Sequence, residues 1–240
     1  MTHFDEIAEE YMEQVPEHIR LHYLKKKTRL IECILQGLNN KDKLVGLDLG
    51  CGLGWYSQKL SIEGYGNIIG LDFSENEIRI AKATYNHLCF MVGTAKYLPF
   101  KNESLDFVYS INMFHHLSAK IQKIAFYEIE RVLKPDGYFF LQEINMRNPL
   151  FRLYMRYIFP NIKKIDTGDE EWVSTKKLNE LNGLELTKID YFTFMPDFTP
   201  KYVFPIFKKI ECALEKTALR KYGIHYMATL KKLQGLRNRL

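Results

Sequence analysis

The chain has 240 residues, of which 46% are hydrophobic and 26% charged, and its formal net charge is +5. These values are typical of one folded domain with a substantial core, and they exclude a disordered or collagen-like chain. No window approaches the roughly 20 uninterrupted apolar residues of a membrane-spanning helix. The first segment is acidic, unlike a secretory signal, and the four cysteines (Cys33, Cys51, Cys89 and Cys212) are far apart. We therefore expect a cytoplasmic protein without disulfides or a structural zinc site.

The positive charge is concentrated in the C-terminal part. Residues 1–150 contain 17 Lys and Arg against 19 Asp and Glu, whereas residues 151–240 contain 17 against 10. The net charges of the two parts are therefore −2 and +7. Such a basic part is compatible with an acidic substrate, an anionic membrane surface or RNA, and equally with a solvated basic face.

Two helices are predicted over residues 4–38, because apolar residues recur at helical spacing up to Leu38. From residue 44 onward, short apolar runs alternate with helical patterns. The predicted strands are 44–49, 66–73, 88–92, 105–111 and 138–144, and the helices between them are 55–62, 74–87 and 118–133. Strands that are apolar on both faces and alternate with helices indicate a parallel sheet covered on both sides. The fold class is therefore α/β, with a doubly wound sheet.

After the fifth strand, the alternation becomes less regular. The predicted elements are a helix from Asn148 to about Pro160, a loop over 161–171, a helix over 174–181, a strand over 186–194, a helix over 204–219 and a strand over 223–230. The chain thus has seven predicted strands, with helical insertions after strands five and six.

The first strand ends in a glycine-rich turn, DLGCGLG (48–54). In open α/β sheets, ligands bind at the carboxyl ends of the strands, where glycines let backbone N–H groups approach closely. The GxGxG spacing differs from the GxGxxG of nicotinamide-binding domains, and Asp48 suits an ammonium group better than a pyrophosphate. Asp72, at the end of the second strand, can accept hydrogen bonds from the hydroxyls of a ribose. S-adenosylmethionine has an amine and a ribose but no phosphate, so it fits both acids.

Four segments in this order resemble the class I S-adenosylmethionine-dependent methyltransferases, namely VGLDLGCGLGWYS (45–57), GLDFSENEI (70–78), GTAKYLPFKNESLDFVYSINMFHHL (93–117) and RVLKPDGYFFLQE (131–143). They are most similar to the small-molecule subgroup that includes the ubiquinone and menaquinone C-methyltransferases (methyltransferase domain type 11/25). The resemblance implies a Rossmann-like sheet that is mostly parallel with an antiparallel last strand. It also implies one domain, 1–240, with an N-terminal helical cap (1–40), a cofactor-binding core (41–145) and a C-terminal half with acceptor-side insertions (146–240).

The resemblance assigns cofactor-binding roles to individual residues. The expected contacts are Asp48 at the amino group, Gly50, Cys51 and Gly52 through their backbone, Asp72 at the ribose, Phe73, Thr94 and Ala95 at the adenine, Ser110 and Ile111 at the methionine part, and Tyr11 folded over the cofactor. Thr94 stands where the family usually has an acid, so the adenine contact departs from the family pattern. Tyr11 serves equally well as a packing residue of its helix.

Methyl transfer from a sulfonium mainly needs alignment of the acceptor, and a general base is useful only when the acceptor carries a proton. His115 is the candidate base because it follows the fourth strand, and His116 is the alternative. Further polar candidates on the C-terminal aromatic segments are Tyr154, Arg156, Tyr157 and His225. No metal is expected, because the acids at the ends of strands four and five are too few for a metal site.

The acceptor is expected to be a small molecule. The aromatic and basic segments 149–160 and 191–207 favour a lid over an apolar, quinone-like or lipid-like acceptor, with peripheral contact to an anionic membrane. Packing within the insertion explains the same aromatic residues. No DNA partner is expected, because the place after strand four lacks the proline-rich motif of base amine methyltransferases.

Two alternatives remain open on the sequence alone. The +7 C-terminal part allows an RNA or protein methyltransferase, although no appended RNA-binding module is recognisable. The replacement at Thr94 allows a protein that binds S-adenosylmethionine without catalysis. A nicotinamide-dependent dehydrogenase is disfavoured by the glycine spacing and by Asp48.

Overall fold

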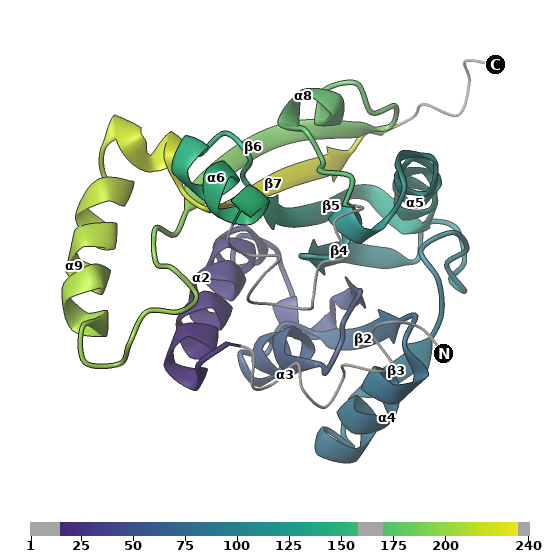
Figure 1. The fold of residues 1–240 in the computed structure, drawn as a ribbon. Helices are drawn as coiled ribbons and strands as arrows, with labels where there is room; N and C mark the ends of the chain where they lie inside the picture. Colours follow the sequence, from purple (N-terminus) through teal and green to yellow (C-terminus); the bar gives the residue numbers. More distant parts are fainter. Residues whose placement is uncertain (1–14, 158–169, 235–240) are drawn as a thin grey trace.

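The computed structural model describes residues 15–157 and 170–234, which form a seven-stranded sheet with helices on both faces (Figure 1). The strands are β1 (Val45–Leu49), β2 (Asn67–Asp72), β3 (Cys89–Val92), β4 (Leu105–Ile111), β5 (Leu133–Ile144), β6 (Leu184–Phe192) and β7 (His225–Lys232). Their order across the sheet is β3-β2-β1-β4-β5-β7-β6. The pairs from β3 to β5 are parallel, and β7 is antiparallel to both of its neighbours. The predicted sheet, with an antiparallel last strand, is confirmed.

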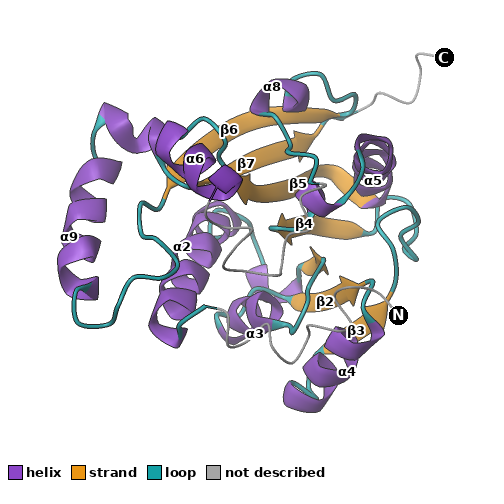
Figure 2. Cartoon of the chain, in the orientation of Figure 1, coloured by secondary structure: helices purple, strands orange, loops and turns teal. Residues whose placement is uncertain are grey.

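The helices alternate with these strands in the chain (Figure 2). The described α-helices are α2 (Glu17–Leu35), α3 (Trp55–Ile62), α4 (Glu75–Thr84), α5 (Ala119–Val132), α6 (Pro149–Tyr157), α8 (Thr175–Leu178) and α9 (Phe204–Glu215). Ser74 caps α4 by accepting a hydrogen bond from the backbone N–H of Glu77, as its Ser-x-x-Glu sequence predicts. Within the described ranges, no helix is both long and apolar enough to cross a membrane.

Alternate residues of the central strands supply two separate hydrophobic layers. On β4, Phe107 and Tyr109 pack with Ile31 of α2 and Leu60 of α3. The residue between them, Val108, packs on the opposite face. That opposite layer also contains Leu47 and Leu49 of β1, Phe126 and Ile129 of α5, and Leu178 of α8. A strand's side chains alternate between faces, so one strand fills both layers.

The antiparallel direction of β7 brings its first residue to the functional edge of the sheet. His225 pairs in register with Ile144, the last residue of β5, and with Phe192, the last residue of β6. The carboxyl ends of the parallel strands and the amino end of β7 therefore meet at one edge. This edge is where the fold class predicts a ligand site.

Two of the differences between predicted and observed boundaries have a clear structural cause. β5 begins at Leu133, before the predicted start at 138, because Leu133 pairs with Leu105 across an irregularity in the register. α9 ends at Glu215, because Thr217 accepts a hydrogen bond from the Leu219 backbone and caps a separate short 3-10 helix, Ala218–Tyr222. The helix predicted before residue 15, the end of the helix predicted up to Pro160 and most of the loop predicted after it lie outside the described residues.

Candidate active site

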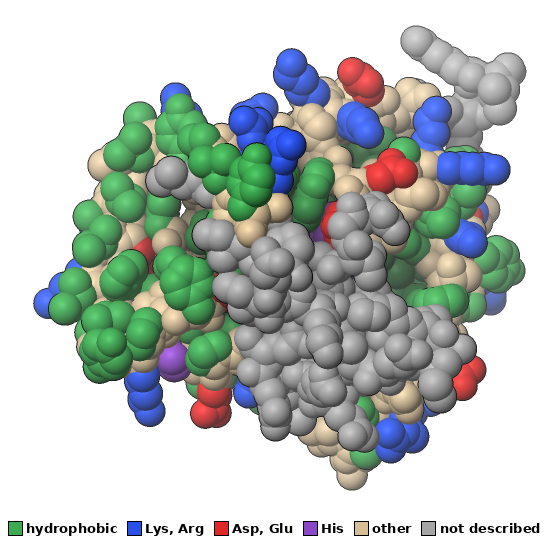
Figure 3. All heavy atoms as spheres, viewed as in Figure 1, with side chains coloured by type: hydrophobic (Ala, Val, Ile, Leu, Met, Phe, Trp, Pro, Cys, Tyr) green, Lys and Arg blue, Asp and Glu red, His purple; other side chains and the backbone are tan. Residues whose placement is uncertain are grey.

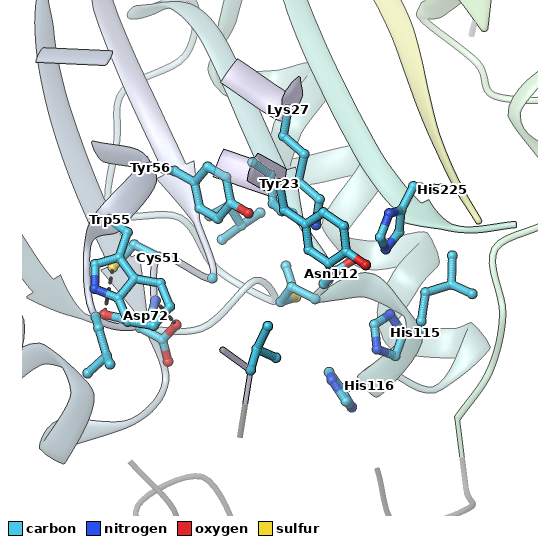
Figure 4. A pocket seen from close by; sticks show the side chains of 18 of the residues that line it. Tyr23, Lys27, Cys51, Trp55, Tyr56, Asp72, Asn112, His115, His116 and His225 are labelled. Carbon is cyan, nitrogen blue, oxygen red and sulfur yellow. Dashed lines mark hydrogen bonds between the residues drawn. The ribbon is translucent and has the colours of Figure 1, made fainter. Parts of the chain in front are cut away.

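A cavity of about 820 Å³ lies at this edge of the sheet. Its walls come from the glycine turn, the ends of β2 and β4, α2, and the segments that precede and follow the C-terminal strands. Figure 4 shows two groups of lining residues at its opposite ends. We name them the Asp72 end (Cys51, Trp55 and Asp72) and the His225 end (Tyr23, Lys27 and His225).

The glycine turn forms the floor of the Asp72 end. Gly50 and Gly52 have φ angles of +78° and +51°, which side chains rarely tolerate. A Cβ atom on Gly50 would lie 2.5 Å from Cγ of Met113, whereas a Cβ atom on Gly52 would meet nothing closer than 3.6 Å. The backbone at Gly52 is therefore open, so a ligand can approach its peptide groups directly.

Asp72 is oriented by two backbone donors. Its Oδ2 accepts a hydrogen bond from Gly52 N at 2.8 Å, and its Oδ1 accepts one from Ser74 N at 2.9 Å. A carboxylate held in this orientation at the end of β2 can accept hydrogen bonds from the vicinal hydroxyls of a ribose.

Other predicted cofactor residues surround the same end. Phe73 is 63% exposed and offers an uncovered ring at the rim, while Ala95 and Ile111 are buried wall residues. Thr94 lines the cavity, and its hydroxyl accepts a hydrogen bond from Lys96 N at 3.3 Å. Trp55 is a lining residue that sequence reasoning did not assign, although its place directly after the glycine turn was the available signal.

The thiol of Cys51 lines the cavity without the properties of a nucleophile. Burial, together with the charges of Asp48 and Asp72, raises its pKa well above the ordinary value. A protonated thiol is a weak nucleophile. Cys51 therefore contributes its backbone and its shape.

Asp48 and Ser110, which were expected near the cofactor, Asp48 directly or through water, are not among the residues that line the cavity. Asp48 alternates with Leu47 and Leu49 on β1, so its side chain points to the α3 face, where the hydroxyl of Ser57 donates a hydrogen bond to it at 2.7 Å. It is only 1% exposed, and burial raises its pKa to about 7 against the effect of the Ser57 hydrogen bond. Ser110 is fully buried, and its hydroxyl has no hydrogen-bond partner within the described part of the chain.

His115 lies in the cavity wall, next to the end of β4, and forms a buried pair with a carboxylate. Its Nδ1 is 2.5 Å from Oε2 of Glu143, and Oε1 of Glu143 accepts a hydrogen bond from Phe114 N at 2.8 Å. The imidazole ring also stacks on Trp172, with ring centroids 5.1 Å apart. Sequence spacing does not predict this pair, because Glu143 follows His115 by 28 positions and lies on a different element.

The polar candidates on the C-terminal aromatic segments fall into two groups, those that line the cavity and those that do not. Tyr154 and His225 line the cavity, whereas Arg156 and Tyr157 do not. The Tyr154 hydroxyl donates a hydrogen bond to Asp197 at 3.3 Å, and both burial and the Asp197 charge raise its pKa. Among the described residues, no three His, Cys, Asp or Glu side chains gather as a metal-binding group.

The wall at the His225 end depends on a buried ion cluster between α2 and α9. Glu211 of α9 accepts from His22 and Lys26 of α2, both at 2.7 Å. Its other oxygen accepts from the backbone N–H of Phe194, which lines the cavity, at 2.9 Å. Burial alone would raise the pKa of Glu211, but the hydrogen bonds from His22 and Lys26 lower it to about 2. Tyr23 is fixed nearby, because its hydroxyl donates to the carbonyl oxygen of Met195 at 2.6 Å.

Comparison with known proteins agrees with this site. A family model described as a methyltransferase domain matches residues 47–141. An uncharacterized protein of Methanocaldococcus jannaschii is 34% identical over 155 residues, covering 65% of this chain and 56% of that protein. The demethylmenaquinone methyltransferase of Staphylococcus aureus strain MRSA252 is 28% identical over 169 residues, covering 65% of this chain and 69% of that enzyme. The chain thus spans only a little over half of the first of these relatives.

Two solved structures share the fold over nearly their whole length. One is the chain bound to the Trm112 methyltransferase activator of Haloferax volcanii, with a TM-score of 0.66, 22% identity and coverage of 97% of this chain and 98% of that one. The other is an S-adenosylmethionine-dependent methyltransferase of Thermotoga maritima, with a TM-score of 0.64, 21% identity and coverage of 95% and 97%. Residues 47–141 therefore form a methyltransferase domain, and the proteins that the chain resembles include S-adenosylmethionine-dependent methyltransferases. S-adenosylmethionine is the cofactor of such enzymes, and the open glycine turn and the oriented carboxylate of Asp72 fit it.

Proposed function

We propose that this protein transfers a methyl group from S-adenosylmethionine to a small, apolar, quinone-like or lipid-like acceptor in the cytoplasm. The observation that carries the proposal is one continuous cavity that joins the Asp72 end to a second, largely apolar region. The apolar side chains there include Phe151, Phe194, Pro196, Phe198 and Ile224. A volume of about 820 Å³ is in the range that holds two small molecules side by side. The similarity to a demethylmenaquinone methyltransferase supports an acceptor of this kind.

In this proposal, the Asp72 end holds the cofactor. The backbone of Gly50, Cys51 and Gly52 and the side chains of Asp72, Phe73, Thr94, Ala95 and Ile111 form its surroundings. Tyr11 lies outside the described residues and stays a sequence prediction. Asp48 acts from beneath the turn, where it holds Ser57 and supports the glycine loop from α3.

The chain contributes alignment and proton acceptance to the reaction. The bound cofactor supplies an electrophilic methyl group, and the walls of the cavity hold the acceptor in line with it and away from water. His115 accepts the proton of a hydroxyl acceptor, because the carboxylate of Glu143 at its Nδ1 stabilises the imidazolium that forms. Glu143 therefore acts as a positioning residue.

Binding of S-adenosylhomocysteine, measured by titration calorimetry, tests the cofactor assignment. The wild type is expected to bind with micromolar affinity, and Asp72→Ala to lose at least about tenfold, because the ribose loses a charged acceptor. Glu75→Ala, at the first residue of α4, serves as the exposed acidic control. A wild type that does not bind S-adenosylhomocysteine would contradict the proposed function.

A second part of the proposal concerns the route of an apolar acceptor. Apolar side chains gather on the outer side of α9 and on the loop before it (Figure 3). The exposed apolar residues are Tyr202, Ile206, Phe207 and Ile210, and the lysines among them are Lys201, Lys208 and Lys209. Apolar side chains surrounded by lysines are typical of a surface that binds anionic lipid. We expect this surface, the α9 patch, to contact an anionic membrane.

Vesicle co-sedimentation tests the α9 patch. The wild type should bind vesicles that contain anionic phosphatidylglycerol and should bind pure phosphatidylcholine vesicles weakly. Ile206→Asp should abolish this difference between anionic and neutral vesicles. Ile62→Asp is the matched control, since Ile62 is an equally exposed isoleucine on α3. No binding to anionic vesicles at low salt would contradict membrane contact while leaving the methyltransferase proposal intact.

RNA or protein acceptors are the alternative, since the chain in the Haloferax volcanii structure was solved with an activator protein. Transfer of a labelled methyl group to total RNA that nuclease abolishes, or to protein that protease abolishes, would favour this alternative. Binding of the cofactor without transfer to any of these acceptor classes would favour a non-catalytic role.

A further inference from the structure

A lysine from α2 reaches the His225 end of the cavity. Lys27 is 1% exposed, and its Nζ lies 5.7 Å from the centre of the Tyr23 ring and 5.9 Å from that of Tyr56. Within residues 15–157 and 170–234, its ammonium group has no hydrogen bond and no ion pair. Burial lowers the pKa of Lys27 to about 7, although the charge of Glu143 acts in the opposite direction. A buried lysine without a partner is costly to the fold, which is typical of a functional group.

His225 adds a second polar side chain to this part of the cavity wall. Its side chain lines the cavity and meets the Tyr23 ring edge-on, with centroids 5.3 Å apart. His225 is 6% exposed, and its Nδ1 has no hydrogen-bond partner in the described structure. Burial and the neighbouring charge of Lys27 lower the pKa of His225 well below its usual value. A neutral imidazole can still donate one hydrogen bond.

The acids near this pair are already committed to other partners. Both oxygens of Glu143 accept hydrogen bonds, one from His115 and one from the Phe114 backbone. Lys26, the neighbour of Lys27, is in turn occupied by α9 carboxylates, whereas Lys27 is not. Asp197, which also lines the cavity, accepts a hydrogen bond from Tyr154. The His225 end therefore has a cation without a carboxylate partner among the described residues, together with a neutral donor.

We propose that Lys27 and His225 form a subsite for a negatively charged oxygen of a ligand. This inference rests on the proposed function and specifies the chemistry of the bound molecule. The oxygen belongs either to the ionised hydroxyl of a phenol or enol acceptor or to the carboxylate of the cofactor. In the first case the acceptor is bound as its anion, which is a stronger nucleophile than the neutral hydroxyl.

The first possibility, that the bound oxygen belongs to the acceptor, is tested with 4-nitrophenol. This phenol absorbs visible light only when it is ionised. The full chain, saturated with S-adenosylhomocysteine, is titrated at a pH where the free phenol is mostly neutral. Binding to the wild type should increase the nitrophenolate absorbance. Lys27→Met should weaken nitrophenolate binding by about tenfold or more, as loss of a buried charged donor predicts. His225→Gln should weaken it less.

Two controls distinguish the subsite from general effects of mutation. Lys25→Met removes an exposed lysine from the same helix and should leave nitrophenolate binding unchanged. Nitrobenzene, which has no ionisable hydroxyl, should bind wild type and Lys27→Met equally. Thermal melts should show all three variants folded, because methionine replaces the buried stem of Lys27 with similar volume.

The second possibility, that the bound oxygen belongs to the cofactor carboxylate, is tested by comparing the affinities of S-adenosylhomocysteine and 5′-methylthioadenosine. The latter lacks the carboxylate. If the subsite holds the cofactor, Lys27→Met weakens binding of the former by about tenfold and leaves the latter unchanged. If Lys27→Met changes neither this comparison nor nitrophenolate binding, the subsite proposal is wrong. A wild type that binds nitrophenolate but not S-adenosylhomocysteine would instead overturn the proposed function and keep the subsite.

Discussion

His115 Nδ1 and Glu143 Oε2 lie 2.5 Å apart, and both side chains are buried, His115 in the 3-10 helix that follows β4 and Glu143 near the end of β5. The carboxylate fixes the ring orientation, favours a hydrogen on Nδ1 and stabilises the charged imidazolium. The stacked ring of Trp172 restricts the imidazole further. This arrangement is suited to accepting a proton from a ligand in the cavity.

The first prediction follows from this pair. With a hydroxyl acceptor, His115→Ala should lower turnover by about 100-fold or more, the usual contribution of a general base. Glu143→Gln should lower turnover less and shift the pH profile of kcat, because the imidazole loses its counter-charge. Methyl transfer assays across pH, together with calorimetry of S-adenosylhomocysteine, provide the measurement. Unchanged turnover in His115→Ala, with cofactor affinity retained, would exclude the base.

The second prediction concerns the floor of the Asp72 end. Gly52 and Gly64 both have positive φ angles, and neither has an atom within 3.4 Å of an added Cβ. Alanine at either position should therefore cost a similar conformational energy, about 1 kcal/mol. Only Gly52→Ala places a methyl group in the cavity, so only it should weaken S-adenosylhomocysteine binding. Equal affinities for the two variants would contradict the assignment of the glycine turn.

The third prediction uses the perturbed titration of Asp48. Its pKa is raised from 3.8 to about 7 by burial, so the folded protein binds this proton more tightly than the unfolded chain. The favourable contribution is complete below about pH 4 and is lost as the pH rises to about 7. Asp48→Asn should therefore raise the free energy of unfolding at about pH 8, by an order of 2–4 kcal/mol, and change it little at about pH 4. Urea unfolding at the two pH values measures the difference, and an equal effect at both would contradict the raised pKa.

The fourth prediction concerns the ion cluster between α2 and α9. The pKa of Glu211 lies at about 2, below the ordinary value of 4.5, so its contribution is present above about pH 4.5 and is lost as the pH falls toward 2. Glu211→Gln should lower the free energy of unfolding at neutral pH by about 3 kcal/mol, because Lys26 and His22 lose a buried partner.

The control for this variant is Glu180→Gln, which removes an exposed carboxylate and should have almost no effect. Hydrogen exchange adds a local measurement, since α9 and the backbone of Phe194 should lose protection in Glu211→Gln while β1 and β2 keep theirs. Uniform loss of protection over the whole sheet would show that the cluster stabilises the entire fold and not the cavity wall alone.

The sequence predicted the sheet and the Asp72 end well because their signals are local. Apolar runs identify β1 and β2, the glycines identify the turn, and Asp72 lies where a strand ends. Alternation within a strand is equally local: Leu47 and Leu49 face one layer, so Asp48 between them faces the other.

The His225 end could not be predicted in the same way. Lys27 is one of three consecutive lysines, and only the packing of α2 on the sheet distinguishes the buried one from its neighbours. The Glu143–His115 pair joins residues 28 positions apart, and no spacing rule connects them. Tertiary contacts of this kind leave no periodic signal in one sequence.

The bond between His22 and Glu211 spans 189 positions, which has a consequence for biosynthesis. A ribosome completes β1, β2 and β4 well before it reaches α9, so the emerging chain can fold its nucleoside-recognising half while the opposite wall is still unmade. A product truncated before residue 204 would retain the Asp72 carboxylate and the glycine turn. It would lack Glu211, which accepts the hydrogen bond from the backbone of Phe194. The elements around Asp72 are therefore synthesised before α9, which completes the cavity wall at Phe194.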